Sequence, residues 1–394
     1  MTTPYWLDPT PNLHGALEGN VECDIVVIGG GLCGTSAALH LAEMGVRVVL
    51  LEGRHLAESA SGRNAGFILQ GTAERYSRAV SLMGRERARK IHAWTVENHE
   101  RMAACIRQHE IDCAYQKRGS LQLAGSKEEE VELLESAALL NEDGFAANER
   151  AGKDLPFALQ NAGFEIGVHL PGDGELDPAR LVRGIARAAA TQGASIHEQS
   201  RVVDLDASEV GDVRVRTSDG EIRAAVAVVA TNARAGELLP WFSDKVDPVR
   251  GQMLATEPCP PLFDCPIYAN HGYDYWRQDE KGCVVLGGWR NLDPQAEVGH
   301  QEVVNMDIQS HMEEFLTRVG VDAPITHRWA GIMGFSRDGL PLVGPAPGAA
   351  GAVVGTGFTG HGYGFAFLAG AALAQVAVEG THPFCTDLDP RRLS

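Results

Sequence analysis

The sequence lacks paired cysteines. None of its eight cysteines forms a C-x-x-C pair, the spacing that is typical of zinc sites and of redox motifs. We therefore expect no metal site. Scattered cysteines of this kind suit reduced thiols in a cytoplasmic protein.

The sequence also lacks a long hydrophobic run. No stretch approaches the roughly 18 apolar residues that span a bilayer. The N-terminal stretch MTTPYWLDPTPNLHG has neither the basic start nor the apolar core of a signal peptide. We expect a cytoplasmic protein with no membrane span.

Positive charge is scarce. Lysine and arginine number 34 against 52 aspartate and glutamate residues, which gives a formal net charge of −18. This balance argues against a nucleic-acid partner, and it fits either a solvated acidic surface, the simpler interpretation, or a cationic substrate. The 44% content of hydrophobic residues in a chain of 394 excludes disorder and predicts a globular protein of two domains.

The sequence does contain a dinucleotide-binding pattern near its N-terminus. The apolar run Ile25–Ile28 predicts a strand buried on both faces, and Gly29, Gly31 and Gly34 then supply G-x-G-x-x-G. We expect Gly29 to permit a tight turn, Gly31 to let the backbone approach a pyrophosphate, and Gly34 to let the next helix pack on the sheet. A second strand over residues 46–51 ends at Glu52, where an acid can hydrogen-bond the adenosine ribose.

Beyond this unit, helical and strand patterns alternate along the chain. Residues 82–110 and 128–141 are typical of amphipathic helices, and a helix that starts at Pro178 is followed by strands over residues 194–230. Residues 241–330 favour antiparallel strands, with a helix over 302–319. We predict an α/β fold with a discontinuous Rossmann-like nucleotide-binding domain (residues 1–92, 165–240 and 331–394). An α+β substrate domain with a mostly antiparallel sheet takes residues 93–164 and 241–330.

A second glycine motif lies near the C-terminus. Gly355, Gly357 and Gly360 again fit G-x-G-x-x-G, but no second strand and ribose acid follow the alanine-rich helix over residues 365–378. We therefore interpret the turn GTGFTGHGYG as a place where the backbone closely approaches a flat ligand. The helix N-terminus at residues 362–365 would supply positive potential to an anionic ring.

Several motifs together resemble one enzyme superfamily. They are the opening βαβ unit, SASGRNAG at residues 59–66, MLATEP at 253–258, CVVLGGWR at 283–290, FSRDGLPLVG at 335–344 and GFTGHGYG at 357–364. This set resembles the FAD-dependent D-amino-acid, glycine and sarcosine oxidase superfamily, and within it the γ-glutamylputrescine oxidoreductases and their relatives. The resemblance covers nearly the whole chain.

The resemblance implies FAD, with the nucleotide-binding domain as a Rossmann-like FAD-binding domain. The ADP portion would lie on the first glycine motif and Glu52, and the pyrophosphate and flavin edges on Ser61, Arg63 and Asn64. Adenine would lie beside Val202 and Val203, and the flavin ring against residues 357–362. The implied cofactor-binding residues are Gly29, Gly31, Leu32, Cys33, Gly34, Glu52, Gly53, Arg54, Ser61, Gly62, Arg63, Asn64, Ala65, Val202, Val203, Thr231, Asn232, Gly357, Thr359, Gly360, His361 and Gly362.

Departures from the superfamily pattern add further expectations. Sarcosine oxidases attach their flavin through a cysteine, for which this chain has Gly331, and related dehydrogenases use a histidine where it has Arg63 and Asn64, so we expect non-covalent FAD. The oxygen-activating lysine and the carboxylate-binding lysine of sarcosine oxidases would correspond to Leu286 and Gly364. Their absence argues against small amino acids as substrates and against fast use of oxygen.

The candidate catalytic residues are His361, Tyr273, Tyr275, Trp289 and Arg290, with Met333 and Tyr363 as weaker candidates. His361 either tunes the flavin or holds the amine, or its imidazole is satisfied by backbone contacts. Strand alternation places Tyr273 and Tyr275 on one face and Trp276 on the other, so not all of these rings line the pocket and core packing is the alternative for each.

Our leading hypothesis is oxidation of the C–N bond of an amine to an imine, which water hydrolyses to a carbonyl compound and an amine while O2 is reduced to H2O2. One alternative is a D-amino-acid or N-methyl amino-acid dehydrogenase that passes electrons to a carrier protein or quinone. A non-catalytic flavin-binding subunit is another. A buried substrate carboxylate needs a cation, and the positions that correspond to the lysines of sarcosine oxidases are Gly364 and Leu286 here. Arg277 and Arg290 are then the only nearby cations on the strands expected to cover the flavin, so we expect amines without an α-carboxylate to be the better substrates.

Overall fold

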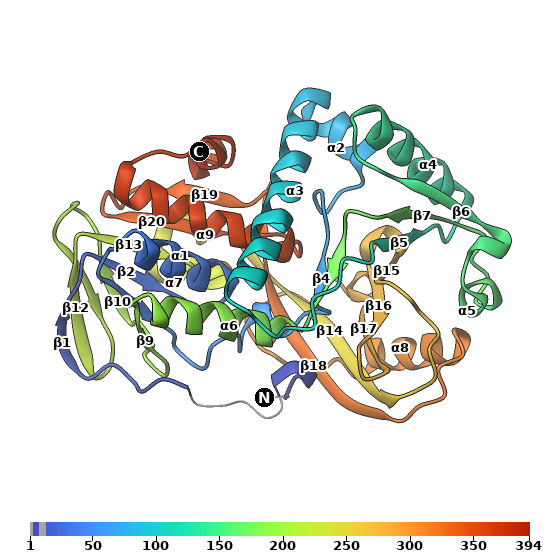
Figure 1. Ribbon diagram of the computed structural model, residues 1–394, viewed down its shortest axis with the longest axis horizontal. Coiled ribbons are helices and arrows are strands. Elements are labelled where there is room, and N and C mark those ends of the chain that lie inside the picture. Colours follow the sequence, from blue (N-terminus) through green and yellow to red (C-terminus); the bar gives the residue numbers. More distant parts are fainter. Residues whose placement is uncertain (1–2, 8–12) are drawn as a thin grey trace.

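The computed structural model describes residues 3–7 and 13–394. Its first unit is built on a six-stranded sheet with helices on one face (Figure 1). The strand order is β19 (Leu342–Pro345), β20 (Ala352–Thr356), β13 (Val226–Val229), β2 (Ile25–Ile28), β3 (Val48–Leu51) and β9 (Ser195–His197). All neighbours are parallel except β19 and β20, which is the arrangement of a Rossmann-like sheet.

Both faces of this sheet are covered, which explains the unbroken apolar strands. Ile25 and Val27 point into a core shared with three helices: α1 (Leu32–Glu43), α6 (Pro178–Thr191) and α9 (Gly362–Glu379). Val26 and Ile28 point to the other side, against a small four-stranded sheet. That sheet has the order β1 (Gly19–Glu22), β12 (Gly220–Ala224), β11 (Val213–Arg216) and β10 (Asp204–Asp206).

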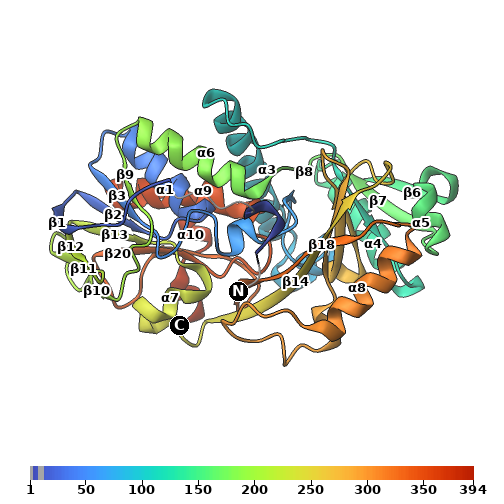
Figure 2. The same cartoon turned by 90° about the horizontal axis from the view of Figure 1, so that it is seen from below.

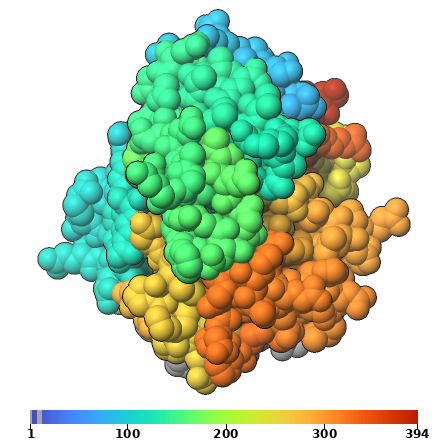
Figure 3. Space-filling model, turned by 90° about the vertical axis from the view of Figure 1, so that its right-hand side faces the viewer, coloured from blue at the N-terminus to red at the C-terminus, as the bar shows by residue number. Residues whose placement is uncertain are grey.

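The second unit is an eight-stranded sheet in which one neighbouring pair, β15 with β5, is parallel. Its order is β18 (Ile325–Ser336), β14 (Val246–Pro258), β17 (Cys283–Gly288), β16 (Asp274–Gln278), β15 (Ile267–Ala269), β5 (Ser120–Leu123), β7 (Ile166–Leu170) and β6 (Asn148–Ala151). Helix α8 (Met306–Arg318) covers one face of β14, β16 and β17. Figure 3 views this unit from its outer end, where the chain around α5 (Phe157–Asn161, green) lies beside the chain around α8 (orange).

The remaining elements connect or close these sheets. They are β4 (Phe67–Ile68) paired with β8 (Gly174–Glu175), α2 (Tyr76–Met83), α3 (Arg85–Gln108), α4 (Lys127–Glu142), α7 (Ala235–Leu238), α10 (Pro383–Asp387), and the short 3-10 helices η1 (Tyr5–Leu7), η2 (Ala60–Gly62), η3 (Gly152–Asp154), η4 (Asn232–Arg234), η5 (Pro240–Phe242), η6 (Asn270–Gly272), η7 (Arg290–Leu292) and η8 (Pro390–Leu393). Strands β14 and β18 extend from the eight-stranded sheet toward the first unit (Figure 2), and Phe335 of β18 forms a bridge to Phe358 in the C-terminal glycine turn.

The predicted fold class is confirmed, and some predicted boundaries differ. The helix expected over residues 82–110 is two helices, because Gly84 has a φ of 81°. The helix expected from residue 302 begins at Met306, since the Asn305 side chain caps it by accepting from the N–H groups of Asp307 and Ile308. Because β7 pairs with β5 and β6, we propose that the boundary predicted at residue 165 lies after Leu170.

Helix α9 is more apolar than expected from the sequence. Among the described residues it alone is long and apolar enough to cross a bilayer, yet 72% of it is buried inside the protein. It packs on α1 and α3 and against β20. Core packing therefore accounts for its apolar surface.

Candidate active site

A cavity of about 390 Å³ lies between the two units. One end is lined by the carboxyl ends of β2 and β3 and by the start of α1, and the other by β16, β18 and the C-terminal glycine turn. In open α/β sheets, ligands bind outside the carboxyl ends of the parallel strands. The cavity therefore continues from a nucleotide-type site to the face of the second sheet.

The first glycine motif has the geometry that its sequence predicts. Gly29 has a φ of 116°, and a Cβ on it would lie 2.6 Å from the carbonyl oxygen of Ala230. A Cβ on Gly34 would overlap the carbonyl oxygen of Gly29, so only glycine lets α1 pack this closely on β2. Gly31 lines the cavity at the N-cap of α1, where the helix dipole favours an anion.

Glu52 lies at the end of β3 and faces this turn. Its Oε2 accepts from the N–H of Gly30 at 2.6 Å, and its Oε1 accepts from the N–H of Arg54 at 2.8 Å. Burial raises the pKa of Glu52, and these two donors oppose that shift. The carboxylate is thus fixed in place at the wall of the cavity.

The early loop, residues 58–66, is held by its own side chains. Ser61 Oγ accepts from the N–H of Leu32 at 3.0 Å, and this contact ties the loop to the start of α1. Asn64 Nδ2 donates to the carbonyls of Ala60 and Ser61, while its Oδ1 accepts from the N–H of Gly66 at 2.7 Å. Ser61 and Asn64 line the cavity, together with Ala65.

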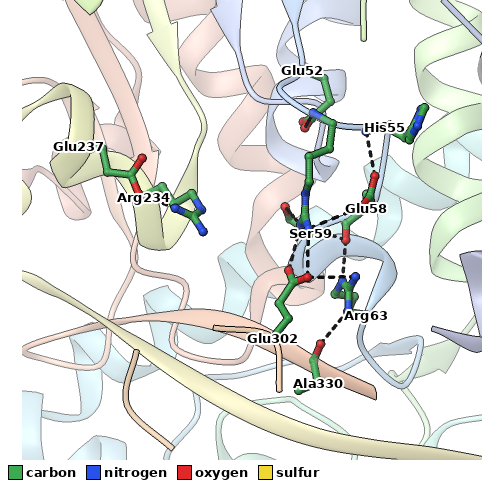
Figure 4. Close-up of polar contacts among 10 residues, drawn as sticks. Glu52, His55, Glu58, Ser59, Arg63, Arg234, Glu237, Glu302 and Ala330 are labelled. Atoms are coloured by element: carbon green, nitrogen blue, oxygen red, sulfur yellow. Dashed lines mark hydrogen bonds and ion pairs between the residues drawn. The ribbon is translucent and has the colours of Figure 1, made fainter. Parts of the chain in front are cut away.

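Arg63 does not line the cavity, and its contact with the cofactor stays a prediction. Its guanidinium is buried and forms an ion pair with Glu302 at 3.0 Å, and it donates to the carbonyls of Ala330 and Glu58 (Figure 4). Arg54 does line the cavity and binds the same carboxylate at 2.9 Å. Glu302 was not among the predicted residues, because it lies in a stretch that the sequence assigned to a helix.

The other predicted cofactor residues divide into two groups. Those that line the cavity are Leu32, Cys33, Gly53, Val202, Thr231, Asn232, Thr359, Gly360, His361 and Gly362. Those outside it are Gly62, Val203 and Gly357. Val203 is 59% exposed, a Cβ on Gly62 would overlap the carbonyl of Ala57, and Gly357 with φ 68° packs on Ser336.

Aromatic rings line the end of the cavity away from the nucleotide site. Tyr275 and Tyr268 stack with ring centroids 5.6 Å apart, and Phe67 lies 5.7 Å from Tyr268 and 6.2 Å from Tyr275. Burial raises the pKa of Tyr275 to about 12, so its hydroxyl stays protonated near neutral pH. Neither Tyr268 nor Phe67 was among the predicted site residues. The strand that carries Tyr268 has only three residues, which is too short for a clear pattern. Phe67 could have been found, because it directly follows the SASGRNAG motif.

Two predicted aromatic residues do not reach the cavity. Trp289 packs on Phe315 of α8 at 5.1 Å, on the face of the sheet that also buries Trp276. Tyr273 has helical backbone angles, φ −76° and ψ −24°, so strand alternation does not extend to it. The predicted opposition of Tyr275 and Trp276 is found, and the predicted pairing of Tyr273 with Tyr275 is not.

Arg290 lines the cavity with no acidic partner among the described residues. Its guanidinium stacks on Tyr273 at 4.4 Å and on Phe335 at 5.0 Å. Arg277, in contrast, is buried outside the cavity and pairs with Glu175 at 3.1 Å. Of Arg277 and Arg290, only Arg290 is therefore available to a ligand.

His361 is the N-cap residue of α9 and lines the same end of the cavity. Burial lowers its pKa to about 4, and the charge of Arg290 acts in the same direction. No described residue hydrogen-bonds its Nδ1. The imidazole is thus neutral at physiological pH, and this Nδ1 atom is buried.

The two positions that we aligned with lysines carry no ligand group. Leu286 is buried against α8, on the face of the sheet opposite to the cavity, so it does not lie above a ligand. A Cβ on Gly364 would lie 2.6 Å from the carbonyl oxygen of Leu69, which leaves no room for a side chain. Among the described residues, no lysine lines the cavity.

A family model described as FAD dependent oxidoreductase matches residues 24–376. The chain belongs to this family. It is 27% identical over 392 residues to γ-glutamylputrescine oxidoreductase of Escherichia coli (91% of this chain, 84% of that protein). It is also 27% identical to glycine oxidase of Bacillus licheniformis over 343 residues (82% and 84%). The crystal structure of glycine oxidase from Geobacillus kaustophilus has the same fold, with a TM-score of 0.76, 22% identity, and 92% and 95% of the two chains covered.

The cofactor of this enzyme is FAD, and the residues of the cavity fit it. The glycine turn leaves room where a Cβ would intrude, and the site extends from Glu52 to the aromatic end. At Gly331, which we aligned with the flavin-linking cysteine of sarcosine oxidases, a Cβ would lie 2.9 Å from the side chain of Arg63. FAD is accordingly bound without a covalent bond, and the protein is an FAD-dependent oxidoreductase.

Proposed function

We propose that the enzyme oxidises the C–N bond of an amine or amino acid to an imine, which water then hydrolyses to a carbonyl compound and an amine. The names of two relatives, γ-glutamylputrescine oxidoreductase and glycine oxidase, indicate an amine derivative and an amino acid as their substrates. The observation that carries the proposal is the combination of Arg290, His361 and the aromatic rings at one end of the FAD cavity.

The side chains would orient the substrate. FAD, when bound, supplies the oxidising group that accepts a hydride from the substrate carbon. Tyr268 and Tyr275 offer apolar faces to the carbon chain, and neutral His361 can accept a hydrogen bond from the amine. Positioning of the C–H bond is the main contribution that such a reaction needs from the protein.

Arg290 leads us to revise the substrate class that we expected from the sequence. We had favoured amines without an α-carboxylate, partly because we placed Leu286 above the flavin. A cation in the cavity with no acidic partner favours a substrate that brings a carboxylate, because a charge-assisted bidentate pair is the strongest contact that a guanidinium makes. We therefore propose an amine that also carries a carboxylate.

For the second half-reaction we propose that O2 accepts the electrons and is reduced to H2O2. Transfer to a carrier protein or quinone is the alternative. Release of H2O2 in step with substrate loss would support the oxidase. Turnover only with an added dye would support the dehydrogenase.

The experiment that tests the substrate class is anaerobic flavin reduction by glycine, sarcosine and D-alanine and by putrescine and other alkylamines. We expect the amino acids to reduce wild type faster, and Arg290→Met to slow them about 100-fold with little effect on alkylamines. Arg318→Met is the control, because Arg318 also stacks on a ring, Phe315, but on the far face of the sheet. Equal rates for both substrate groups in wild type would contradict the carboxylate proposal.

A further inference from the structure

Three consecutive carbonyl groups of the early loop each accept a hydrogen bond from a side-chain N–H on a different part of the chain. The pairs are Trp329 Nε1 to Arg63 at 3.0 Å, Trp6 Nε1 to Asn64 at 2.7 Å and Arg277 Nε to Ala65 at 2.7 Å. None of the three donor residues lines the cavity, whereas Asn64 and Ala65 do. The donors therefore hold the loop from its outer side.

Because the peptide bond is planar, a donor that fixes a carbonyl group also fixes the direction of the N–H group that follows it. In a trans peptide the carbonyl and the following N–H point to opposite sides. The carbonyls of Arg63 and Asn64 point to their indole donors, so the N–H groups of Asn64 and Ala65 point away from those donors, and both of these residues line the cavity. The outer donors thus set which backbone groups the loop presents to a ligand.

Trp6 is the only one of these donors that lies outside the two large sheets. It belongs to η1, and the residue is buried. The guanidinium of Arg277 lies 4.9 Å from its centroid, and Tyr5 contacts it edge-on at 4.8 Å. The hydroxyl of Tyr5 donates to Asp279 at 2.7 Å, so this short segment bridges the early loop and the turn that follows β16.

Leu7 completes the contact between this segment and the loop. Its side chain lies 3.2 Å from where a Cβ on Gly62 would be, so η1 packs directly against η2. Removal of the Trp6 donor would leave the carbonyl of Asn64 facing a buried ring without a partner. The peptide could then rotate, and rotation would change the donors that face the cavity.

We propose that Trp6 is a positioning residue for FAD: through its bond to the Asn64 carbonyl, the N-terminal 3-10 helix fixes the backbone donors of the early loop toward the cofactor. The proposal depends on FAD as the cofactor and not on the proposed substrate. It predicts an effect on cofactor affinity that is separate from the stability of the protein.

The test is Trp6→Phe in the full chain, with Trp94→Phe as the matched control. Trp94 also donates its indole N–H, to Asp387 at 2.8 Å, and packs edge-on against Phe384, and none of these three residues lines the cavity. Tryptophan and tyrosine fluorescence would follow thermal unfolding of the apoproteins, and flavin fluorescence would give the dissociation constant of FAD. We expect the dissociation constant to rise about three- to tenfold in Trp6→Phe and to stay unchanged in Trp94→Phe, as one net hydrogen bond predicts.

Two results would overturn the proposal. One is an unchanged FAD dissociation constant in Trp6→Phe. The other is weaker binding in both variants in proportion to their loss of apoprotein stability, because that would mark a general structural effect. If Trp6→Phe did not fold, Trp329→Phe would test the neighbouring carbonyl with the same two measurements, and unchanged affinity there would equally contradict the role of the outer donors.

Discussion

Burial of His361 sets its protonation state before any substrate arrives. Because its pKa is lowered to about 4, the imidazole does not titrate between pH 6 and 9. If it holds the amine, His361→Ala should slow anaerobic flavin reduction about tenfold, which corresponds to roughly 1.4 kcal/mol in the barrier. Wild type should show an increase in rate with pH that follows the substrate amine and no inflection near pH 6.5.

Stopped-flow measurement of flavin absorbance checks both parts of this prediction. FAD content in the variant should be measured in parallel, so that loss of cofactor is not mistaken for slow chemistry. Equal reduction rates in the variant and in wild type would mean that the His361 imidazole does not act on the substrate or the flavin.

Glu52 is a second residue whose environment predicts a measurable effect. Glu52→Arg would replace an acceptor that holds the N–H groups of Gly30 and Arg54 with a cation. We expect FAD binding to weaken by about 1.5–3 kcal/mol, the range for a hydrogen bond to a charged group. Titration of apoprotein with FAD measures this, and an unchanged dissociation constant would remove Glu52 from the cofactor site.

The contact between α1 and β2 depends on the absence of one side chain. A Cβ at Gly34 would overlap the carbonyl of Gly29, so Gly34→Ala must push the helix off the strand. We expect a loss of about 1–3 kcal/mol in stability, as overpacking of a core does, together with weaker FAD binding. Gly15→Ala is the control, since nothing lies within 4 Å of its added Cβ.

Urea unfolding of both variants gives the comparison. Gly34→Ala should unfold at a lower urea concentration than wild type, and Gly15→Ala should match wild type. A Gly34→Ala variant as stable as wild type would show that α1 can shift without cost.

The sequence predicted elements whose stabilising contacts are local and missed those whose contacts are distant. The strand Ile25–Ile28, the glycine turn and Glu52 follow each other within thirty residues, so their pattern is visible in the sequence. The ion pair between Arg63 and Glu302 was not predicted, because the two residues lie far apart along the chain. Tyr273 and Trp289 were misplaced because the backbone leaves the strand at both positions, with φ of 57° at Trp289.

The positions of Tyr275, Arg290 and His361 in one cavity agree with the motifs from which they were chosen, and their roles in catalysis stay predictions. Leu286 shows that an error of one residue in a sequence alignment places a side chain on the wrong face of a strand. A shift of one residue along β17 separates the face toward the cavity, where Gly287 lies against Tyr275, from the face toward α8.

Buried histidines make the stability of the whole molecule sensitive to acid. Burial lowers the pKa of His92 and His99, both on α3, to about 4, as it does for His361. The unfolded chain therefore takes up protons first, and the free energy of unfolding should fall as the pH drops from about 6.5 toward 4. Asp173 has the opposite effect on the free energy of unfolding. Burial raises its pKa to about 7, so the folded chain takes up this proton first as the pH drops.

His92→Phe tests this account. His92 lies between Tyr76 and Phe145, so an apolar ring suits its surroundings. We expect the variant to lose less stability than wild type between pH 7 and pH 5, as measured by urea unfolding at the two pH values. An identical loss in both proteins would show that His92 does not contribute.

The order of strands in the six-stranded sheet also determines when its parts can assemble during synthesis, because the chain is made from its N-terminus. About 300 residues separate β3 from β20 and α9, so at about 5–20 residues per second a ribosome needs roughly 15–60 s between them. During that time α1 lacks α9, the helix that later buries its apolar face. The nascent chain must therefore keep this surface from aggregating until α9 has been synthesised, and only then is the FAD site complete.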